Sequence, residues 1–182
     1  MTDLFMAILG CNPANRFIEQ HDVFFGIGSS IVELKQDMYD FWPEAGEKLH
    51  IDSYRPVRKV DNYKIQIVDK DETISENGLH LYFLNLGGYK PMDMEEYHYK
   101  QLVVASSMAE AIATAKKDVF WKHHNEPHVD NKYGIDVDDA YLVDDMLGPN
   151  FRAKYKIQIE ELQETQSEDE LTIGYLKLSR LI

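Results

Sequence analysis

The chain of 182 residues is 44% hydrophobic and 12% aromatic, which is enough apolar surface to bury the core of one domain or of two small ones. Its formal net charge of -13 argues against nucleic acid and anionic membranes as partners, because binding to either needs clustered Lys and Arg. No stretch of the sequence approaches the roughly 18 apolar residues of a membrane span. The single cysteine, Cys11, cannot form an intramolecular disulfide, which favours a reducing, cytoplasmic location and a packed thiol.

Two short apolar runs open the two halves of the chain. Residues 4–9 read LFMAIL, and residues 79–84 read LHLYFL. Runs of this length and composition are typical of strands that are buried on both faces. The second run lies in mid-chain, where a signal peptide cannot be, so we interpret both runs as the first strand of a repeated unit.

The repeat extends along most of the chain. The matched residues include His21 with His98, Glu33 with Glu110, and Trp42 with Trp121. Matches in one order, at a spacing of about 77 residues, indicate a tandem duplication. We therefore predict a first unit over residues 1–68, a polar linker over 69–78, a second unit over 79–147 and a C-terminal extension over 148–182.

A second strand and a helix follow the first strand in each unit. The apolar segments 21–28 and 98–105 predict the strands. The S-x-x-E pattern at 30–33 and again at 107–110 is a capping box, which satisfies unpaired amides in the first turn of a helix. Pro43 is expected to end the first helix. The apolar residues predicted to face the sheet are Ile31, Leu34, Met38 and Phe41 in the first unit and Met108, Ala111, Ala115 and Val119 in the second.

Two further strands close each unit. In the first unit they span residues 50–60 and 63–68, with a hairpin at Asp61 and Asn62. The predicted equivalents in the second unit are residues 128–137 and 140–143, joined at Asp138 and Asp139. The unit is therefore ββαββ, with one main helix packed on a mostly antiparallel sheet, and the fold class is α+β.

The C-terminal region leaves the register of the last strand open. The segment YKIQI at residues 63–67 recurs letter for letter at 155–159. Either the second unit carries an insertion before its last strand, or a hairpin strand has been added. The acidic run 160–170 is expected to be exposed, and residues 171–178 are expected to form a final edge strand.

Three features carry a resemblance to a known family: the pair His21-Asp22, Trp42 at the end of the first helix, and the run HIDSY at 50–54. They resemble an uncharacterised bacterial family, domain of unknown function 1543, which has one or two copies of a domain. The resemblance covers residues 4–143; it implies a repeated unit, and it implies no activity or cofactor. The second copy departs from the pattern, because His98 is followed by Tyr99, so a role that needs His and Asp together is in doubt there.

The candidate site residues form one cluster in each unit: His21, His50 and Asp52 in the first, and His98, His128 and Asp130 in the second. Residues i and i+2 of a strand share a face, so each His-x-Asp pair is expected to lie side by side. Such a pair sets the tautomer of the imidazole and raises its basicity, as general-base chemistry or a divalent metal would require. The structural alternative is a His–Asp hydrogen bond that holds a strand in place.

A second candidate metal site lies in the tract HHNEPH at residues 123–128. His123, His124 and Glu126 offer nitrogen and oxygen ligands at short spacing. The first unit reads EAGEKLH at residues 44–50, so only the last histidine is shared. An exposed loop that contains a proline is the alternative interpretation.

The sequence favours a non-enzymatic binding or protein-interaction module. Its partner, a protein or a small molecule, would meet the groove between the two pseudo-equivalent units, and no cofactor is needed. The sequence contains no recognised nucleophile, phosphate loop or complete metal motif. The alternative is a metal-assisted hydrolase built on the two His/His/Asp clusters, with a divalent metal as cofactor. A third option, a structural subunit of a larger assembly, needs an exposed apolar patch. The oligomeric state does not follow from the sequence.

Overall fold

The computed structural model describes residues 2–74, 77–89, 92, 94–123, 136–164, 167 and 169–181, with the backbone alone for residues 118–123 and 136. The protein is α+β with mostly antiparallel sheets, as the sequence predicts. None of the described helices is long and apolar enough to cross a membrane. The chain forms two compact units: unit 1 comprises Met1–Ile74 and Met146–Ile182, and unit 2 comprises Ser75–Asp145. Unit 1 is therefore discontinuous in sequence.

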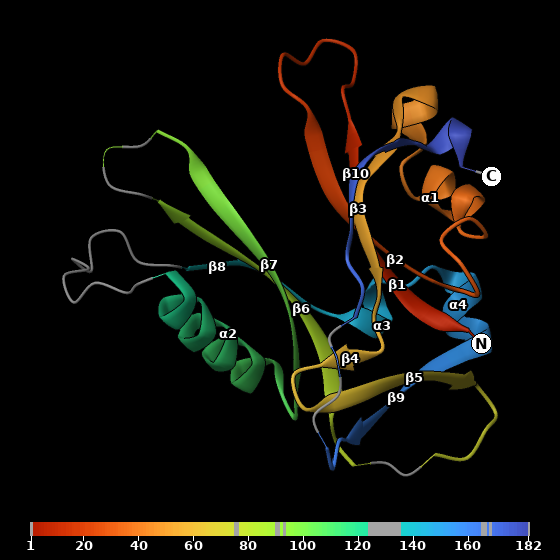
Figure 1. The fold of residues 1–182 in the computed structure, drawn as a ribbon, viewed down its shortest axis with the longest axis vertical. Coiled ribbons are helices and arrows are strands. Elements are labelled where there is room, and N and C mark those ends of the chain that lie inside the picture. Colours follow the sequence, from red (N-terminus) through yellow and green to blue (C-terminus); the bar gives the residue numbers. More distant parts are fainter. Residues whose placement is uncertain are drawn as a thin grey trace. The chain divides into compact units, whose positions relative to one another are not determined.

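The main sheet of unit 1 has four antiparallel strands in the order β10-β3-β1-β2 (Figure 1). Their bounds are Asp3–Cys11 for β1, Gln20–Gly28 for β2, His50–Pro56 for β3 and Thr172–Lys177 for β10. β1 lies inside the sheet and is buried over most of its length, which confirms the prediction of a strand buried on both faces. β10 is the edge strand beside β3, which confirms the edge strand predicted at residues 171–178.

One short α-helix, α1, covers a face of this sheet. α1 spans Lys35–Phe41, and the 3-10 helix η1 follows at Pro43–Lys48. Pro43 therefore ends the α-helix, as predicted. The buried residues of the predicted apolar stripe are Ile31, Leu34 and Met38. Phe41 differs from the expectation: it is 41% exposed, and its ring meets that of Phe24 edge-on, with the centroids 5.6 Å apart.

The core of unit 1 includes the C-terminal segment of the chain. Alternate residues of β1 that face this core are Phe5, Ala7, Leu9 and Cys11. Leu178, in the 3-10 helix η3 (Leu178–Arg180), and Leu181 pack in the same cluster. The backbone amide of Leu178 also donates to the carbonyl oxygen of Leu49, at 3.2 Å. The end of the chain is thus part of the core of unit 1.

A second sheet of unit 1 has three strands in the order β4-β5-β9. Their bounds are Lys59–Val60 for β4, Tyr63–Asp69 for β5 and Tyr155–Glu161 for β9. The hairpin predicted at Asp61 and Asn62 is confirmed, and Asp61 adopts a left-handed backbone with a φ of 50°. The two identical YKIQI segments pair with each other, antiparallel, so that Gln66 lies opposite Gln158.

Unit 2 contains a three-stranded antiparallel sheet in the order β7-β6-β8. The strand bounds are His80–Tyr89 for β6, Glu96–Ala105 for β7 and Asp136–Leu142 for β8. The helix α2 (Met108–His123) packs against all three strands. Ala111 and Ala115 of the predicted apolar stripe are fully buried there. Their small side chains let the helix backbone approach the sheet closely.

The strand β8 differs from its prediction. A hairpin is expected at Asp138 and Asp139, but β8 runs through both residues as one strand. Its register against β6 shifts between Asn85 and Leu86, so one extra residue is accommodated as a bulge and not as a turn. Two helices then separate β8 from β9: α3 (Val143–Met146) and α4 (Pro149–Lys154). This arrangement favours an insertion before the last strand over an added hairpin strand.

The two units have the same strand order. In each, the first strand (β1 or β6) lies between the second strand (β2 or β7) and the strand that follows the main helix (β3 or β8). Both first strands also shift register against that third strand, between residues 8 and 9 in unit 1 and between residues 85 and 86 in unit 2. A shared order with a shared irregularity is what the predicted duplication requires.

Serine–glutamate hydrogen bonds precede the main helix of each unit. The carboxylate of Glu33 accepts from the backbone amide of Ser29 at 2.8 Å and from its hydroxyl at 2.7 Å. The carboxylate of Glu110 accepts from the amide and hydroxyl of Ser106, at 2.9 and 2.6 Å. The amide of Glu110 donates to Ser107 Oγ at 3.3 Å, so Ser107 caps α2 as predicted. In a capping box the glutamate accepts from the amide of the first serine of the S-x-x-E pattern, which is residue 30 or 107. Here each glutamate accepts instead from the serine one position earlier in the chain.

The contact at the start of α2 predicts a pH-dependent stability. The hydrogen bonds from Ser106 hold the pKa of Glu110 below its usual value of 4.5. The stabilisation is therefore complete above the unfolded-state pKa and is lost as the pH falls through the lower folded-state pKa. We expect Glu110→Gln to lower the thermal unfolding temperature, followed by circular dichroism, more at pH 7 than at pH 3. The exposed Glu164→Gln is the control, and an equal loss at both pH values would contradict the assignment.

Candidate functional site

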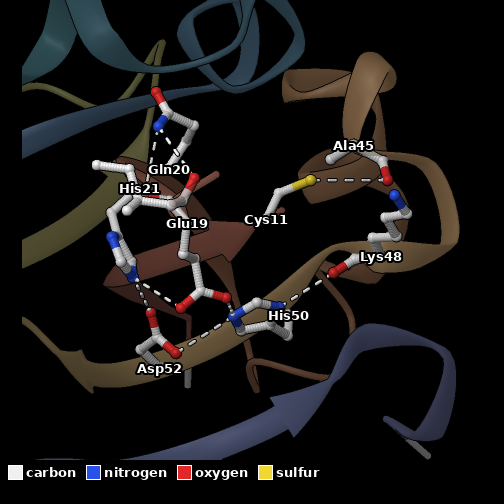
Figure 2. Close-up of polar contacts among 9 residues, drawn as sticks. Cys11, Glu19, Gln20, His21, Ala45, Lys48, His50 and Asp52 are labelled. Atoms are coloured by element: carbon white, nitrogen blue, oxygen red, sulfur yellow. Dashed lines mark hydrogen bonds and ion pairs between the residues drawn. The ribbon is translucent and has the colours of Figure 1, made fainter. Parts of the chain in front are cut away.

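The predicted residues His21, His50 and Asp52 lie together on one face of the main sheet of unit 1 (Figure 2). Gly10 of β1 lies opposite His21 of β2 and opposite His50 of β3, so these three residues form a row across the sheet. Leu9, the neighbour of Gly10, packs in the core beside α1. Because side chains alternate along a strand and cross-strand partners share a face, the row faces away from α1.

Asp52 joins the two histidines because of a bulge in β3. Its neighbours Ile51 and Ser53 pair with consecutive residues of β1, which leaves Asp52 as the extra residue. A bulge redirects the side chain of the bulged strand. The Asp52 carboxylate lies between two imidazoles, with Oδ2 3.1 Å from His21 Nε2 and Oδ1 3.4 Å from His50 Nε2.

A second carboxylate, that of Glu19 just before β2, also bridges the two imidazoles (Figure 2). Its Oε1 lies 2.9 Å from His50 Nε2, and its Oε2 lies 3.5 Å from His21 Nε2. The sequence prediction omits Glu19. A signal was available, because the pattern Glu-x-His occurs at residues 19–21 and again at residues 96–98. Residues two apart in an extended chain share a side, so the pattern brings a carboxylate beside each of these histidines.

His50 is the buried member of the cluster, with a side chain only 3% exposed. Its Nδ1 lies 3.0 Å from the carbonyl oxygen of Lys48, which can only accept, so Nδ1 carries the hydrogen. In the neutral ring Nε2 therefore bears the lone pair, and it is directed toward Glu19 and Asp52. Neither contact has hydrogen-bond geometry, so this buried nitrogen has no hydrogen-bond partner among the described residues. The ring of Tyr175 lies against the imidazole, with the centroids 4.3 Å apart.

Gly10 provides the space that the cluster occupies. A Cβ atom at this position would lie 2.4 Å from His50 Nε2 and 2.9 Å from Asp52 Oδ2. Both distances are below the 3.0 Å that real Cβ contacts respect, so a side chain here would displace one of the two groups. The bare backbone of β1 thus forms the floor of the cluster.

The cluster is open to solvent on the side of His21. The side chains of His21, Glu19 and Asp52 are 43%, 41% and 31% exposed, in contrast to the buried His50. Two carboxylates face two Nε2 atoms, so the cluster carries an excess of negative charge when both histidines are neutral. Such a set of acceptors needs a positive charge between them, which either protons on the imidazoles or a metal ion can supply.

The remaining predicted residues belong to unit 2. His98 lies on β7, and its Nε2 is 3.3 Å from Asp138 Oδ2. The residues outside the part of the chain that the structure describes are His124, Glu126, His128 and Asp130. His123 is the last residue of α2 and is described by its backbone alone. Asp138, which was expected in a hairpin, is therefore a neighbour of His98 that the sequence prediction missed.

Cys11 lies on the opposite face, within the core of unit 1. It is fully buried, and its Sγ is 3.9 Å from the carbonyl oxygen of Ala45 (Figure 2). Burial raises the pKa of the Cys11 thiol above its usual value of 9.0. An activated nucleophilic thiol needs a lowered pKa, so this environment suits a packed thiol.

Comparisons with known proteins support this fold. The chain is similar to the crystal structure of a protein Il1583 from Idiomarina loihiensis, with 24% sequence identity, a TM-score of 0.67 and coverage of 98% of this chain and 99% of that chain. At this identity the likeness shows the fold alone. No curated protein matches the chain. Residues 16–67, which include Glu19, His21, His50 and Asp52, match the family model described as Domain of Unknown Function (DUF1543), and this match supports the resemblance noted in the sequence.

Proposed function

We propose that unit 1 is a metal-binding module that binds one divalent transition-metal ion with ligands drawn from Glu19, His21, His50 and Asp52. The observation that carries the proposal is the buried Nε2 of His50, which is directed at two carboxylates and lacks a hydrogen-bond partner among the described residues. A buried nitrogen without a hydrogen-bond partner is costly, and a bound cation would remove that cost.

The second contact of His50 also fits metal binding. A metal-ligating histidine almost always donates its other ring N–H to a carbonyl or a carboxylate, which fixes the tautomer and the orientation of the ring. Nδ1 of His50 donates to the carbonyl of Lys48 in this way, so Nε2 is prepared as the ligand atom. Two imidazoles with two carboxylates are a donor set typical of zinc and of related first-row ions.

The competing explanation is a structural ion pair, in which protonated histidines hold the two carboxylates. That arrangement would stabilise the strand ends without binding a metal. The two explanations differ in one measurable respect: the stability of a protein with a metal site rises with the logarithm of the free metal concentration above the dissociation constant, whereas the stability that an ion pair between fixed groups gives does not depend on the metal. Zinc-dependent thermal unfolding therefore separates them.

The decisive experiment is isothermal titration of the full, metal-free chain with Zn²⁺. We expect His21→Ala to weaken the tightest zinc-binding phase by roughly 100-fold or more, a larger loss than is typical of residues that only orient a ligand. His21 is half exposed, so the variant should fold. His50→Gln provides a second ligand variant, and His80→Ala, an exposed histidine outside the cluster, is the matched control. Unchanged zinc affinity in His21→Ala and His50→Gln, or no zinc binding at all, would exclude the proposal.

A metal-assisted hydrolase is the second candidate function. The exposed side chains of His21 and Glu19 favour it, because catalysis needs a coordination position that water can reach. The test is hydrolysis of a chromogenic ester and a chromogenic phosphodiester by the zinc-loaded chain. Hydrolysis that is lost in His21→Ala and kept in His80→Ala would support an enzyme. Zinc binding without hydrolysis of either substrate would support a metal-binding protein over a hydrolase.

The sequence-based hypothesis of a protein or small-molecule partner in the groove between the units stays a prediction. The metal-binding proposal uses groups of one unit alone. It keeps the predicted duplication, which we also propose, because the shared strand order and the shared bulge support two copies of one unit.

A further inference from the structure

Unit 2 has a bulged aspartate at the same topological place as unit 1. Gly87 of β6 lies opposite His98 of β7, as Gly10 lies opposite His21. On the other side of β6, the residues before and after Asp138 pair with consecutive residues of β6, so Asp138 is the extra residue of β8, just as Asp52 is the extra residue of β3. The bulge again redirects a carboxylate toward a histidine on the far side of the central strand.

The glycine of the central strand has the same role in both units. A Cβ atom at Gly87 would lie 2.4 Å from Asp138 Oδ2 and 2.8 Å from its Oδ1. The Asp138 carboxylate therefore lies directly over the bare backbone of β6, and from there its Oδ2 reaches to 3.3 Å from His98 Nε2. The position of the carboxylate depends on the tertiary pairing of three strands, so it is a built arrangement and not a chance meeting of surface side chains.

A second carboxylate completes the cluster of unit 2. Glu96 Oε2 lies 4.0 Å from His98 Nε2, in the position that Glu19 has relative to His21. One ligand atom from each of Glu96, His98 and Asp138 lies within 4.8 Å of the other two, a spacing that a single ion at roughly 2.0–2.6 Å from each can bridge. A side-chain hydrogen bond to Glu96 raises the pKa of Tyr89, which lies beside the cluster.

The donor set differs from that of unit 1 in one respect. His50 pairs with Gly10 in unit 1, whereas the residue that pairs with Gly87 in unit 2 is Asp136. The position of β8 that corresponds to the buried His50 of unit 1 is therefore not a histidine. The three described donors of unit 2 are also all exposed, so water competes for the ion more strongly there. Carboxylate-rich sets suit Mn²⁺ and Mg²⁺, whereas imidazole-rich sets favour zinc.

We propose that Glu96, His98 and Asp138 form a second divalent-cation site, richer in oxygen ligands and weaker than the site of unit 1, which takes Mn²⁺ while unit 1 retains zinc. The comparison of the two affinities rests on the proposed function of unit 1. The existence of the second site does not, because all of its ligands belong to unit 2.

The test follows Mn²⁺ by the loss of its free-ion signal in electron paramagnetic resonance. The full chain is titrated with Mn²⁺ twice, once metal-free and once after one equivalent of Zn²⁺. We expect the zinc-loaded chain to bind about one Mn²⁺, with an affinity that falls roughly tenfold or more in His98→Ala and in Asp138→Asn. Glu164→Gln removes one exposed charge elsewhere and controls for unspecific attraction of cations to this acidic chain; His80→Ala controls for loss of a histidine.

The outcomes separate the two sites. Unchanged Mn²⁺ binding in both His98→Ala and Asp138→Asn overturns the second site, as does an equal loss in Glu164→Gln. If instead His98→Ala weakens Mn²⁺ binding in the metal-free chain while His21→Ala leaves zinc binding intact, the second site stands and the proposed function of unit 1 fails. If His98→Ala loses Mn²⁺ binding but still binds the first equivalent of zinc as the wild type does, the result supports both the second site and the proposed metal site of unit 1.

Discussion

Replacing Gly10 with alanine is expected to remove tight metal binding from unit 1 and to lower its free energy of unfolding by about 1–3 kcal/mol, the usual cost of overpacking a filled site. The new methyl group would lie 2.4 Å from His50 Nε2. His50 cannot move aside easily, because it is buried, held at Nδ1 by Lys48 and covered by Tyr175. Either the imidazole or the strand must shift, and both changes displace the ligand atom.

The Gly10→Ala effect is measured by zinc titration and by urea unfolding of the full chain. Gly148→Ala is the matched control, because the nearest atom to a Cβ there, in the ring of Phe151, is at 3.6 Å, an ordinary contact distance. Gly87→Ala should leave the zinc site intact and disturb Asp138 instead. A zinc affinity of Gly10→Ala equal to that of the wild type would show that the cluster does not depend on the space that Gly10 leaves.

Leu178→Ala should destabilise unit 1 by about 2–5 kcal/mol, although the residue lies close to the end of the chain. Leu178 is fully buried in the core with Leu49 and Met38, and its backbone amide is bonded to Leu49. Truncation of a buried leucine loses its transfer free energy and leaves a cavity that its neighbours fill only in part. Urea unfolding, followed by far-ultraviolet circular dichroism, gives the change.

Ile173→Ala is the control for Leu178→Ala. Ile173 lies in the same C-terminal segment, in β10, and is 77% exposed, so its truncation should change stability by less than about 0.5 kcal/mol. Similar small effects for the two variants would mean that the C-terminal segment is not part of the core. A large loss for both would point to an effect on strand pairing and not on packing.

Two bulges give the two proposed sites the same backbone geometry. In each unit a glycine in the central strand leaves space for a carboxylate. A bulged aspartate from the strand on one side of the glycine fills this space, and a histidine lies on the strand on the other side. The unit with the buried His50 should bind a transition metal more tightly than the unit without an equivalent histidine. Under the proposed duplication, the two sites differ in their ligands while the strand geometry that positions them has stayed the same.

Much of the fold follows from local patterns in the sequence. The apolar run at residues 4–9, the serine at the start of α2 and Pro43 act on their immediate neighbours, and the structure has a strand, a cap and a helix end at these places. The hairpin at Asp61 is equally local. Such features depend on backbone preferences and on side-chain alternation over a few residues, which the sequence displays directly.

The site was predicted only in part, because its geometry depends on long-range pairing. The sequence identified three of the residues of the unit 1 cluster: His50 and Asp52, which lie two apart in one strand and so share a face, and His21, which begins the neighbouring predicted strand. Glu19 and Asp138 were missed: the first lies in a connecting segment, and the second lies in a bulge that the sequence suggested was a turn. A bulge is decided by the register that two distant strands adopt, and that register does not appear in a local pattern.

The amino-acid sequence by itself determined the α+β class, the strand–strand–helix order that opens each unit, and the face of β3 on which His50 and Asp52 lie, because each depends on periodicity and on turn chemistry among neighbouring residues. The tertiary structure decided that the C-terminal strands return to unit 1, that the YKIQI segments pair with each other, and that Glu19 and Asp52 meet both histidines. These contacts join residues as far apart in the chain as His50 and Lys177, so burial and strand pairing of the whole unit select them.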